Sequence, residues 1–154
     1  MPRKKSGKHA AQRFKRDIDE IRGFIADVTS ADLGAQWQSW MFEAALLKAY
    51  VAFERLMLGC IVVAINNDTA TLAGQTGIDF PKHLTDEVCE YIVIGRGYFD
   101  FKGRDGLIRE IKKYVSDAHW LLTAVKAPKY KGHLNKLVAL RNYAAHESSA
   151  SKKA

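Results

Sequence analysis

The feature that most constrains the fold is a long run without proline, residues 36–66, in which apolar side chains recur at helical spacing. The apolar positions form one stripe: Trp37, Trp40, Met41, Ala44, Leu47, Val51, Leu58, Ile61 and Ile65. After Arg55 the run is apolar on nearly every side, which predicts burial on all faces. We therefore expect a long helix at the centre of a bundle or along a dimer seam, with Trp37 and Trp40 as core or interface anchors.

The rest of the chain predicts shorter helices joined by loops rich in turn-forming residues. Apolar residues at helical spacing mark five segments: 11–28, 85–94 with Thr85 as its cap, 107–115, 118–126 with Asp117 or Ser116 as its cap, and 134–146. The loop at 67–84 has room for one short helix within 68–73. Residues 91–94 include a β-branched run, so a strand is the alternative there. The fold class that we expect is all-α, a helical bundle with one long central helix and several short ones.

Positive charge is concentrated at the start of the chain. The formal net charge is +7, and seven Lys or Arg residues precede the first acidic residue, Asp17. The remaining chain holds 17 basic and 17 acidic residues, so we expect a body without net charge. We predict a disordered basic tail over 1–10, a single helical domain over 11–147 and a frayed tail over 148–154. Lys4 and Lys5 in the first tail can bind nucleic-acid phosphates without sequence preference.

Composition narrows the class of protein. Hydrophobic residues make up 47% of the 154 residues, which is typical of a globular domain with a real core. The longest apolar run, 56–65, is too short to span a bilayer, and the basic N-terminus lacks the apolar segment of a signal peptide. Cys60 and Cys89 predict buried, reduced thiols, and His119 and His133 have no partner at zinc-ligand spacing. We expect a cytoplasmic protein with no membrane span, metal or cofactor.

Near the end of the chain a helical pattern is broken by three polar residues. The segment 134–146 repeats apolar residues at helical spacing until Arg141, Asn142 and His146 interrupt it. Asn142 and His146 are four residues apart and share a helix face, whereas Arg141 lies about 140° from His146 and must use its long stem to reach the same pocket. A guanidinium binds phosphate through two parallel hydrogen bonds, and an imidazole moves protons near neutral pH. This combination predicts a phosphate-ester site.

The hexapeptide Arg141–His146 resembles the Arg-x4–6-His signature of the HEPN superfamily, in which a polar residue commonly follows the arginine. The segment 49–60, AYVAFERLMLGC, is similar to the early long helix of HEPN proteins, where a glutamate follows an apolar run. The resemblance implies a small, often dimeric helical bundle. In many members it also implies a metal-independent ribonuclease of toxin–antitoxin, phage-defence or CRISPR systems. Arg141, Asn142 and His146 would then be the catalytic residues.

A polar line also runs along the long helix. Tyr50 and Glu54 each fall about 20° from Glu43 on the helical wheel, on either side of it. One interpretation is that Tyr50 and Glu54 face the pocket of Arg141 and His146 and support it. The alternative, which the pattern favours, is a strip of side chains in contact with solvent.

The connector 95–106 combines four glycines, two arginines and three aromatic residues. With Arg96 and Arg104 it could cradle single-stranded RNA through stacking and phosphate contacts. The alternative that we favour is a loop fixed to the core by Tyr98, Phe99 and Phe101. Its Phe-Asp-Phe-Lys sequence, 99–102, resembles a connector of HEPN proteins linked to RNA-repair operons. Lys136, with Lys129 and Lys131, adds positive charge near Arg141 and is a further candidate for RNA binding.

The first functional hypothesis is an endoribonuclease of the toxin or defence type that acts as a homodimer. Metal-free RNA cleavage needs a base, an acid and a cation, and one chain supplies a single suitable histidine, whereas a two-fold dimer supplies two. The second is a non-catalytic helical module that binds RNA or protein, such as an antitoxin partner, with Arg141 and His146 at an interface. The third, a purely structural oligomer, does not explain the Arg-Asn-x3-His pattern.

Overall fold

The computed structural model describes residues 6–146, except for the side chain of His146, and this part of the chain is helical without strands. The α helices are α1 (Gly7–Ser30), α2 (Ala35–Asn67), α3 (Ala70–Thr76), α4 (Asp86–Ile94), α5 (Gly103–Lys112), α6 (Trp120–Lys126) and α7 (Lys131–His146), with a 3₁₀ turn η1 (Pro128–Tyr130) before α7. The all-α prediction is therefore confirmed. Within residues 6–146, no helix combines the length and the apolar character needed to cross a membrane.

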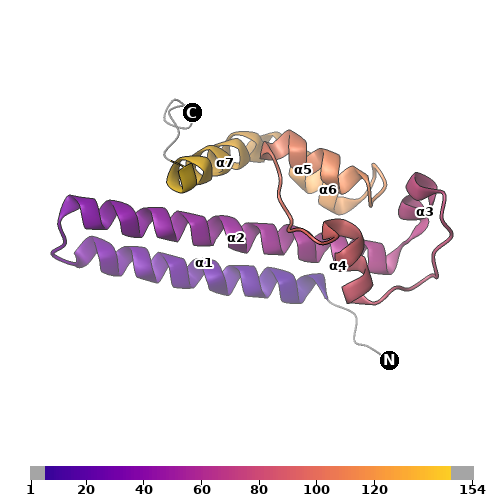
Figure 1. Cartoon of the computed structure of the whole chain (residues 1–154), viewed down its shortest axis with the longest axis horizontal. Helices are drawn as coiled ribbons and strands as arrows, with labels where there is room; N and C mark the ends of the chain where they lie inside the picture. Colours follow the sequence, from indigo (N-terminus) through magenta and orange to yellow (C-terminus); the bar gives the residue numbers. More distant parts are fainter. Residues whose placement is uncertain (1–5, 147–154) are drawn as a thin grey trace.

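The long helix α2 is the element on which the others pack. Figure 1 shows α1 and α2 as an antiparallel hairpin, with α5, α6 and α7 together along the opposite side of α2. Direct contacts join α2 to α1, α4 and α7, and α5 to α6 and α7. The molecule thus has two layers, the α1–α2 hairpin and the group α5–α7, and the end of the hairpin where the chain turns extends beyond α7 (Figure 1).

The core is built around the second half of α2, as the apolar pattern after Arg55 predicts. Its buried side chains meet others from α3 to α6; they include Met57, Cys60, Ile61, Val62, Ile65, Leu72, Cys89, Leu107, Ile111, Leu121 and Leu122. Cys60 and Cys89 are free, buried thiols. Trp37 and Trp40 are not core residues: they are 59% and 50% exposed and pack edge to face, with ring centroids 5.0 Å apart. Trp120 of α6 is likewise exposed rather than part of the core.

Helix α1 begins earlier than the sequence pattern indicates. The expected tail ended at Ala10, but the helix starts at Gly7, with the Ser6 hydroxyl accepting a hydrogen bond from the Lys8 amide at 3.2 Å. The first turns also pack on α2, since a Cβ added at Gly59 would lie only 3.2 Å from that of Ala10. The cap and this close approach order Gly7–Ala10 despite the surrounding positive charge. Residues 1–5 and 147–154 of the two predicted tails lie outside the described residues.

The local capping signals explain where the shorter helices begin. Thr85 caps α4 by accepting a hydrogen bond from the Val88 amide at 3.3 Å, and α4 continues through Ile94, so the alternative of a strand at 91–94 is wrong. Helix α6 is capped by His119, whose Nδ1 accepts from the Leu121 amide at 3.2 Å, rather than by Ser116 or Asp117. Asp117 instead pairs with lysines of α5 and α6, which joins these helices.

The connector between α4 and α5 is fixed by two of its three aromatic residues. Phe99 and Phe101 are buried, and the Phe101 ring packs on Tyr50 and Phe53 of α2 at centroid distances of 5.4 and 5.5 Å. Tyr98, at 77% exposure, takes no part in the anchor. The favoured interpretation of this loop therefore holds for Phe99 and Phe101 alone.

We predict that Phe101→Ala lowers the free energy of unfolding by about 3–5 kcal/mol, because it removes a buried ring that joins the connector to α2. Tyr98→Ala, the matched change at an exposed ring of the same loop, should stay within about 0.5 kcal/mol of the wild type. Urea unfolding of both variants measures the difference. Equal stability of the two would contradict this anchor.

Candidate functional site

The candidate site lies where α7 crosses the middle of α2. Arg141 of α7 places its guanidinium carbon 4.9 Å from the centroid of the Tyr50 ring. The same ring is stacked on Phe101, with centroids 5.4 Å apart and planes 14° apart. A guanidinium over an aromatic ring is attracted to its electron-rich face, so Tyr50 holds Arg141 in place. Two segments far apart in the sequence, α2 and the connector after α4, thus position one side chain of α7.

Tyr50 is a buried phenol with its hydroxyl among polar groups. The side chain is only 2% exposed, and the hydroxyl lies 3.4 Å from both Asp100 Oδ1 and the Phe101 carbonyl oxygen. Burial, and then the charges of Glu54 and Asp100, raise the pKa of Tyr50 well above its usual range. The phenol is therefore a neutral hydrogen-bond donor at physiological pH rather than a source of charge.

Glu54 lies one turn after Tyr50 on α2 and is partly buried. Its Oε1 is fully buried and has no hydrogen-bond partner among the described residues. Burial, and then the negative charge of Asp100, raise the pKa of Glu54 to about 7, while the charge of Arg141 and the Tyr50 hydroxyl act in the opposite direction. Glu54 is therefore a carboxyl group that can gain or lose a proton near neutral pH, within the electrostatic reach of Arg141.

On α7, Asn142 contacts Arg141 directly. Arg141 Nη1 donates a hydrogen bond to Asn142 Oδ1 at 2.9 Å, and both side chains are partly buried. Asn142 thus orients the arginine in this structure. The backbone of His146 forms the last residue of α7, but its side chain, and hence its relation to Arg141, lies outside the described part of the chain.

The structure brings Arg141, Asn142, Tyr50 and Glu54 together, and it adds Asp100. The sequence pattern favoured a strip open to solvent for Tyr50 and Glu54, yet both pack under α7 because α2 needs cover on that side. Sequence reasoning missed Asp100, which is exposed in the connector but affects the pKa of both Tyr50 and Glu54. The sequence feature that could have identified Asp100 is its position between Phe99 and Phe101, which anchor the connector. Glu43, the third member of the polar line, accepts a hydrogen bond from Ser39 at 3.3 Å.

The predicted RNA-binding residues are dispersed. Lys136 is exposed on α7 and Arg96 is exposed just after α4, while Lys4 and Lys5 fall outside the described residues. The Arg104 side chain is largely covered, and its guanidinium donates to the carbonyl oxygens of Val125, at 3.0 Å from Nε, and of Lys126 at the end of α6. Those contacts supply hydrogen-bond donors to carbonyl groups at the C-terminus of α6, which the helix itself leaves without partners. Arg104 therefore has a structural role, and we leave it out of the RNA-binding set.

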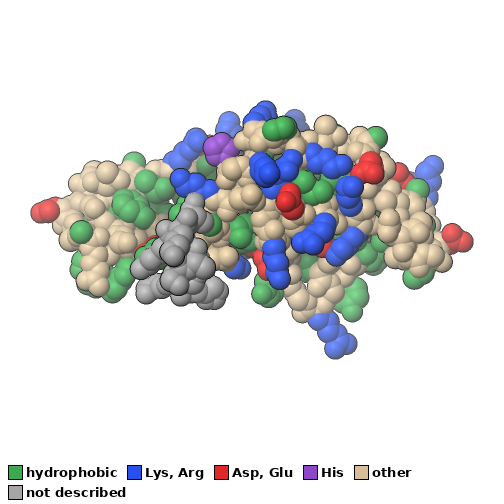
Figure 2. Space-filling view, turned by 90° about the horizontal axis from the view of Figure 1, so that it is seen from above, with side chains coloured by type: hydrophobic (Ala, Val, Ile, Leu, Met, Phe, Trp, Pro, Cys, Tyr) green, Lys and Arg blue, Asp and Glu red, His purple; other side chains and the backbone are tan. Residues whose placement is uncertain are grey.

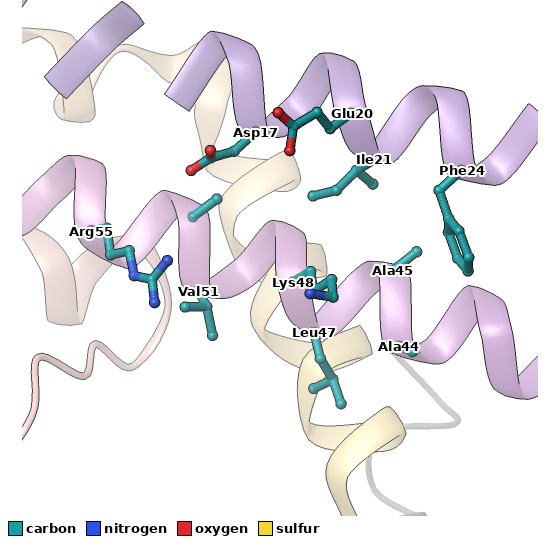
Figure 3. A pocket seen from close by; sticks show the side chains of 11 residues that line it. Asp17, Glu20, Ile21, Phe24, Ala44, Ala45, Leu47, Lys48, Val51 and Arg55 are labelled. Atoms are coloured by element: carbon teal, nitrogen blue, oxygen red, sulfur yellow. The ribbon is translucent and has the colours of Figure 1, made fainter. Parts of the chain in front are cut away.

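A groove of about 550 Å³ lies elsewhere, between α1 and α2 (Figure 3). Asp17 and Glu20 extend from its α1 wall, and Lys48 and Arg55 from its α2 wall. None of the residues around Arg141 lines this groove. It is a surface feature of the hairpin and is separate from the candidate site.

Comparisons with family models, with curated proteins and with solved structures gave no match. The HEPN resemblance therefore rests on the sequence motif and its neighbouring residues alone. Over residues 6–146, no group of three or more His, Cys, Asp or Glu side chains is arranged to hold a metal ion. The chemistry available at the described site comes from a guanidinium, a carboxyl group that titrates near neutrality, a phenol and an amide.

The raised pKa of Glu54 predicts a specific pH dependence of stability. Between the usual carboxyl pKa of 4.5 and about 7, the folded protein binds more protons than the unfolded chain, so this stabilising contribution is complete below 4.5 and lost above 7. Glu54→Gln should remove this decline and stabilise the protein at pH 8 by on the order of 1 kcal/mol, a figure reduced for partial solvent contact. Denaturant unfolding across this pH range measures it. Glu43→Gln on the same helix is the control, and identical pH profiles for both variants would contradict the assignment.

Proposed function

We propose that this protein is a metal-independent endoribonuclease that acts as a homodimer, with Arg141, Asn142 and His146 at its site. The observation that carries the proposal is the position of Arg141, held over the buried Tyr50 ring beside a carboxyl group with a pKa near neutrality. Such a cation is suited to a phosphate group, and perturbed carboxyl groups cluster at functional sites. A toxin or defence role in the cytoplasm, as the HEPN resemblance implies, is part of the same proposal.

The reaction is an internal transfer at phosphorus. A base removes the proton of the ribose 2′-hydroxyl, the O2′–P bond forms, the P–O5′ bond breaks and an acid protonates the leaving 5′-oxygen. The products are a 2′,3′-cyclic phosphate and a 5′-hydroxyl. Arg141 stabilises the charge that builds up on the phosphate oxygens, and Asn142 orients Arg141. His146 exchanges protons with the reacting oxygens, and Tyr50 and Glu54 support the arginine from α2.

The proposed homodimer accounts for the need for two proton-transfer groups, because a two-fold axis places two copies of His146 in one cleft. An exposed apolar surface supports association. At the turn end of the hairpin, α1 and α2 expose large apolar side chains, namely Phe24, Ile25, Trp37, Trp40 and Phe42. Adjoining exposed aromatic residues of this kind typically anchor protein interfaces.

One observation favours a second candidate function, a non-catalytic helical module that binds RNA or an antitoxin-like partner protein. Arg141 is partly buried and already contacts Tyr50 and Asn142, so its role could be to attach α7 to α2. In that case RNA would bind without being cut. The variants below distinguish the two functions.

We expect the wild-type protein to cleave RNA in the presence of EDTA and to leave cyclic phosphate ends. Arg141→Ala should lower the cleavage rate by about 10²–10³-fold, and His146→Ala by about 10²–10⁴-fold. His133→Ala, at an exposed histidine of the same helix, is the matched control and should cleave normally. Gel analysis of labelled RNA with end-group mapping measures the outcome. Cleavage that needs a metal, or that survives His146→Ala, would refute this mechanism.

For the dimer, we predict that Trp37→Ser/Trp40→Ser shifts the protein toward monomer and lowers the cleavage rate, because the exposed aromatic pair would be buried in the interface. Trp120→Ser is the control, since Trp120 has the same 59% exposure as Trp37 but lies on α6. Sedimentation equilibrium gives the dissociation constants. A dimer that dissociates equally in both variants, or a fully active monomer, would exclude this interface.

A further inference from the structure

The group α5–α7 and the described part of the chain before it carry opposite charge. Residues 6–101, from the cap of α1 to the connector, hold nine Lys or Arg and thirteen Asp or Glu, although the α1–α2 hairpin alone holds seven of each. Residues 102–141, from α5 to α7, hold ten Lys or Arg and only three Asp or Glu. Figure 2 shows Lys and Arg side chains gathered over the face where α5, α6 and α7 lie. The balance of charge over the whole body therefore conceals a strongly basic layer.

Half of these cations are exposed and have no acidic partner among the described residues. They are Lys102, Arg109, Lys129, Lys131 and Lys136, and no described carboxylate oxygen lies within 4.0 Å of their charged nitrogens. By contrast, Lys112 and Lys126 share Asp117, at 3.2 and 3.4 Å, and Lys113 pairs with Glu110. Asp105, the third acid of this layer, pairs with Arg104 at 3.6 Å. The acids of the layer are thus occupied by four other cations, which leaves these five available to a ligand.

The start of α7 carries positive charge, which is the unfavourable sign at the N-terminus of a helix. Lys131 is the first residue of α7, Lys129 lies in η1 just before it, and the first turn of α7 contains no acid. The N-terminus of a helix already carries a partial positive charge, so cations there weaken the helix slightly and attract anions. Helix stability therefore does not explain the two lysines, whereas binding of an anionic ligand does.

Exposed aromatic side chains accompany these cations. Trp120 at the start of α6 and Tyr130 in η1 are 59% and 43% exposed, and Lys129 Nζ lies 4.9 Å from the Tyr130 ring centroid. Cations bind phosphates and aromatic rings stack on bases, which together suit single-stranded nucleic acid. An acidic protein would also form ion pairs with the cations, but it would offer the exposed rings no bases on which to stack.

We propose that the exposed face of α5, α6, η1 and α7, here called the basic face, binds the backbone of single-stranded RNA. The basic face includes the helix that carries Arg141, because Lys131, Lys136 and Arg141 all belong to α7. RNA bound on the basic face would thus be held beside the candidate site. The identity of the ligand as RNA rests on the proposed function, whereas the location of the surface rests on the distribution of charge and aromatic residues.

The test measures binding separately from cleavage. A short, unstructured, fluorescein-labelled 2′-O-methyl RNA lacks the attacking hydroxyl and cannot be cut by the proposed reaction, so its anisotropy reports binding alone. We compare Lys129→Gln/Lys131→Gln/Lys136→Gln with Arg22→Gln/Lys48→Gln/Lys82→Gln, which removes the same charge from exposed positions before α5. The first variant should bind on the order of 100-fold more weakly near 0.1 M salt, with a log–log salt slope smaller by about 2, and the second should bind as the wild type does.

Each result supports or overturns one of two claims, the RNA-binding basic face or the proposed ribonuclease activity. Equal weakening by the two triple variants would mean that only net charge matters and would overturn the basic face. Displacement of the RNA by polyglutamate at matched charge concentration would also overturn it, in favour of an acidic protein partner. Loss of binding in the first variant alone, in a protein that never cuts unmodified RNA, would support the basic face and refute the proposed ribonuclease. If the first variant binds RNA as the wild type does and unmodified RNA is still cut, the ribonuclease is supported and the basic face is refuted.

Discussion

The whole structure depends on the need to cover α2. Beyond Arg55 this helix is apolar on nearly all sides, so one neighbouring helix cannot remove it from water. Helix α1 covers one side along its length, α4 packs near its end and α7 crosses it on the side opposite α1. The polar line through Tyr50 and Glu54 lies under that crossing. The same burial requirement that builds the core therefore brings a tyrosine and a glutamate of α2 against the arginine of α7.

That crossing departs from the rules of a satisfied core. A carboxyl oxygen of Glu54 is buried without a hydrogen-bond partner among the described residues, and the Tyr50 hydroxyl makes hydrogen bonds of 3.4 Å. Buried polar groups are normally paired closely, because an unpaired one loses the hydrogen bonds it made to water. Such departures are tolerated at functional sites, and this one surrounds Arg141, which the sequence motif identifies as a candidate site residue.

Much of the fold could be predicted from periodicity, and the exceptions have physical causes. The 33 residues of α2 repeat apolar positions often enough to define the helix within a residue at each end, and Thr85 marks the start of α4 by its cap. The start of α1 was misplaced, because seven early cations suggested a solvated tail while a serine cap and the contact of Ala10 with Gly59 are the stronger influence. The exposure of Trp37 and Trp40 depends on how far α7 extends along α2, which no local pattern reveals.

The site itself was only half visible in the sequence, because it joins three segments. Arg141 and Asn142 stand out by interrupting an apolar helix, but the partnership of Tyr50 with Asp100 depends on the path of the connector, which the burial of Phe99 and Phe101 decides. The charge pattern was hidden in the same way. A count over the chain averages the acidic excess of residues 6–101 with the basic excess of α5 to α7, and only the grouping of these three helices in one layer separates the two.

That separation of charge gives the protein an electric dipole moment directed from the acidic part of the chain before α5 toward α5, α6 and α7. A polyanion approaching in solution exerts a torque on such a dipole and turns the protein before contact, so that productive orientations are over-represented among the first collisions. The effect fades over roughly 10 Å at 0.1 M ionic strength, so orientation by the field is a short-range event. Two copies of the protein that met through their hairpin turns would leave both positive poles directed outward.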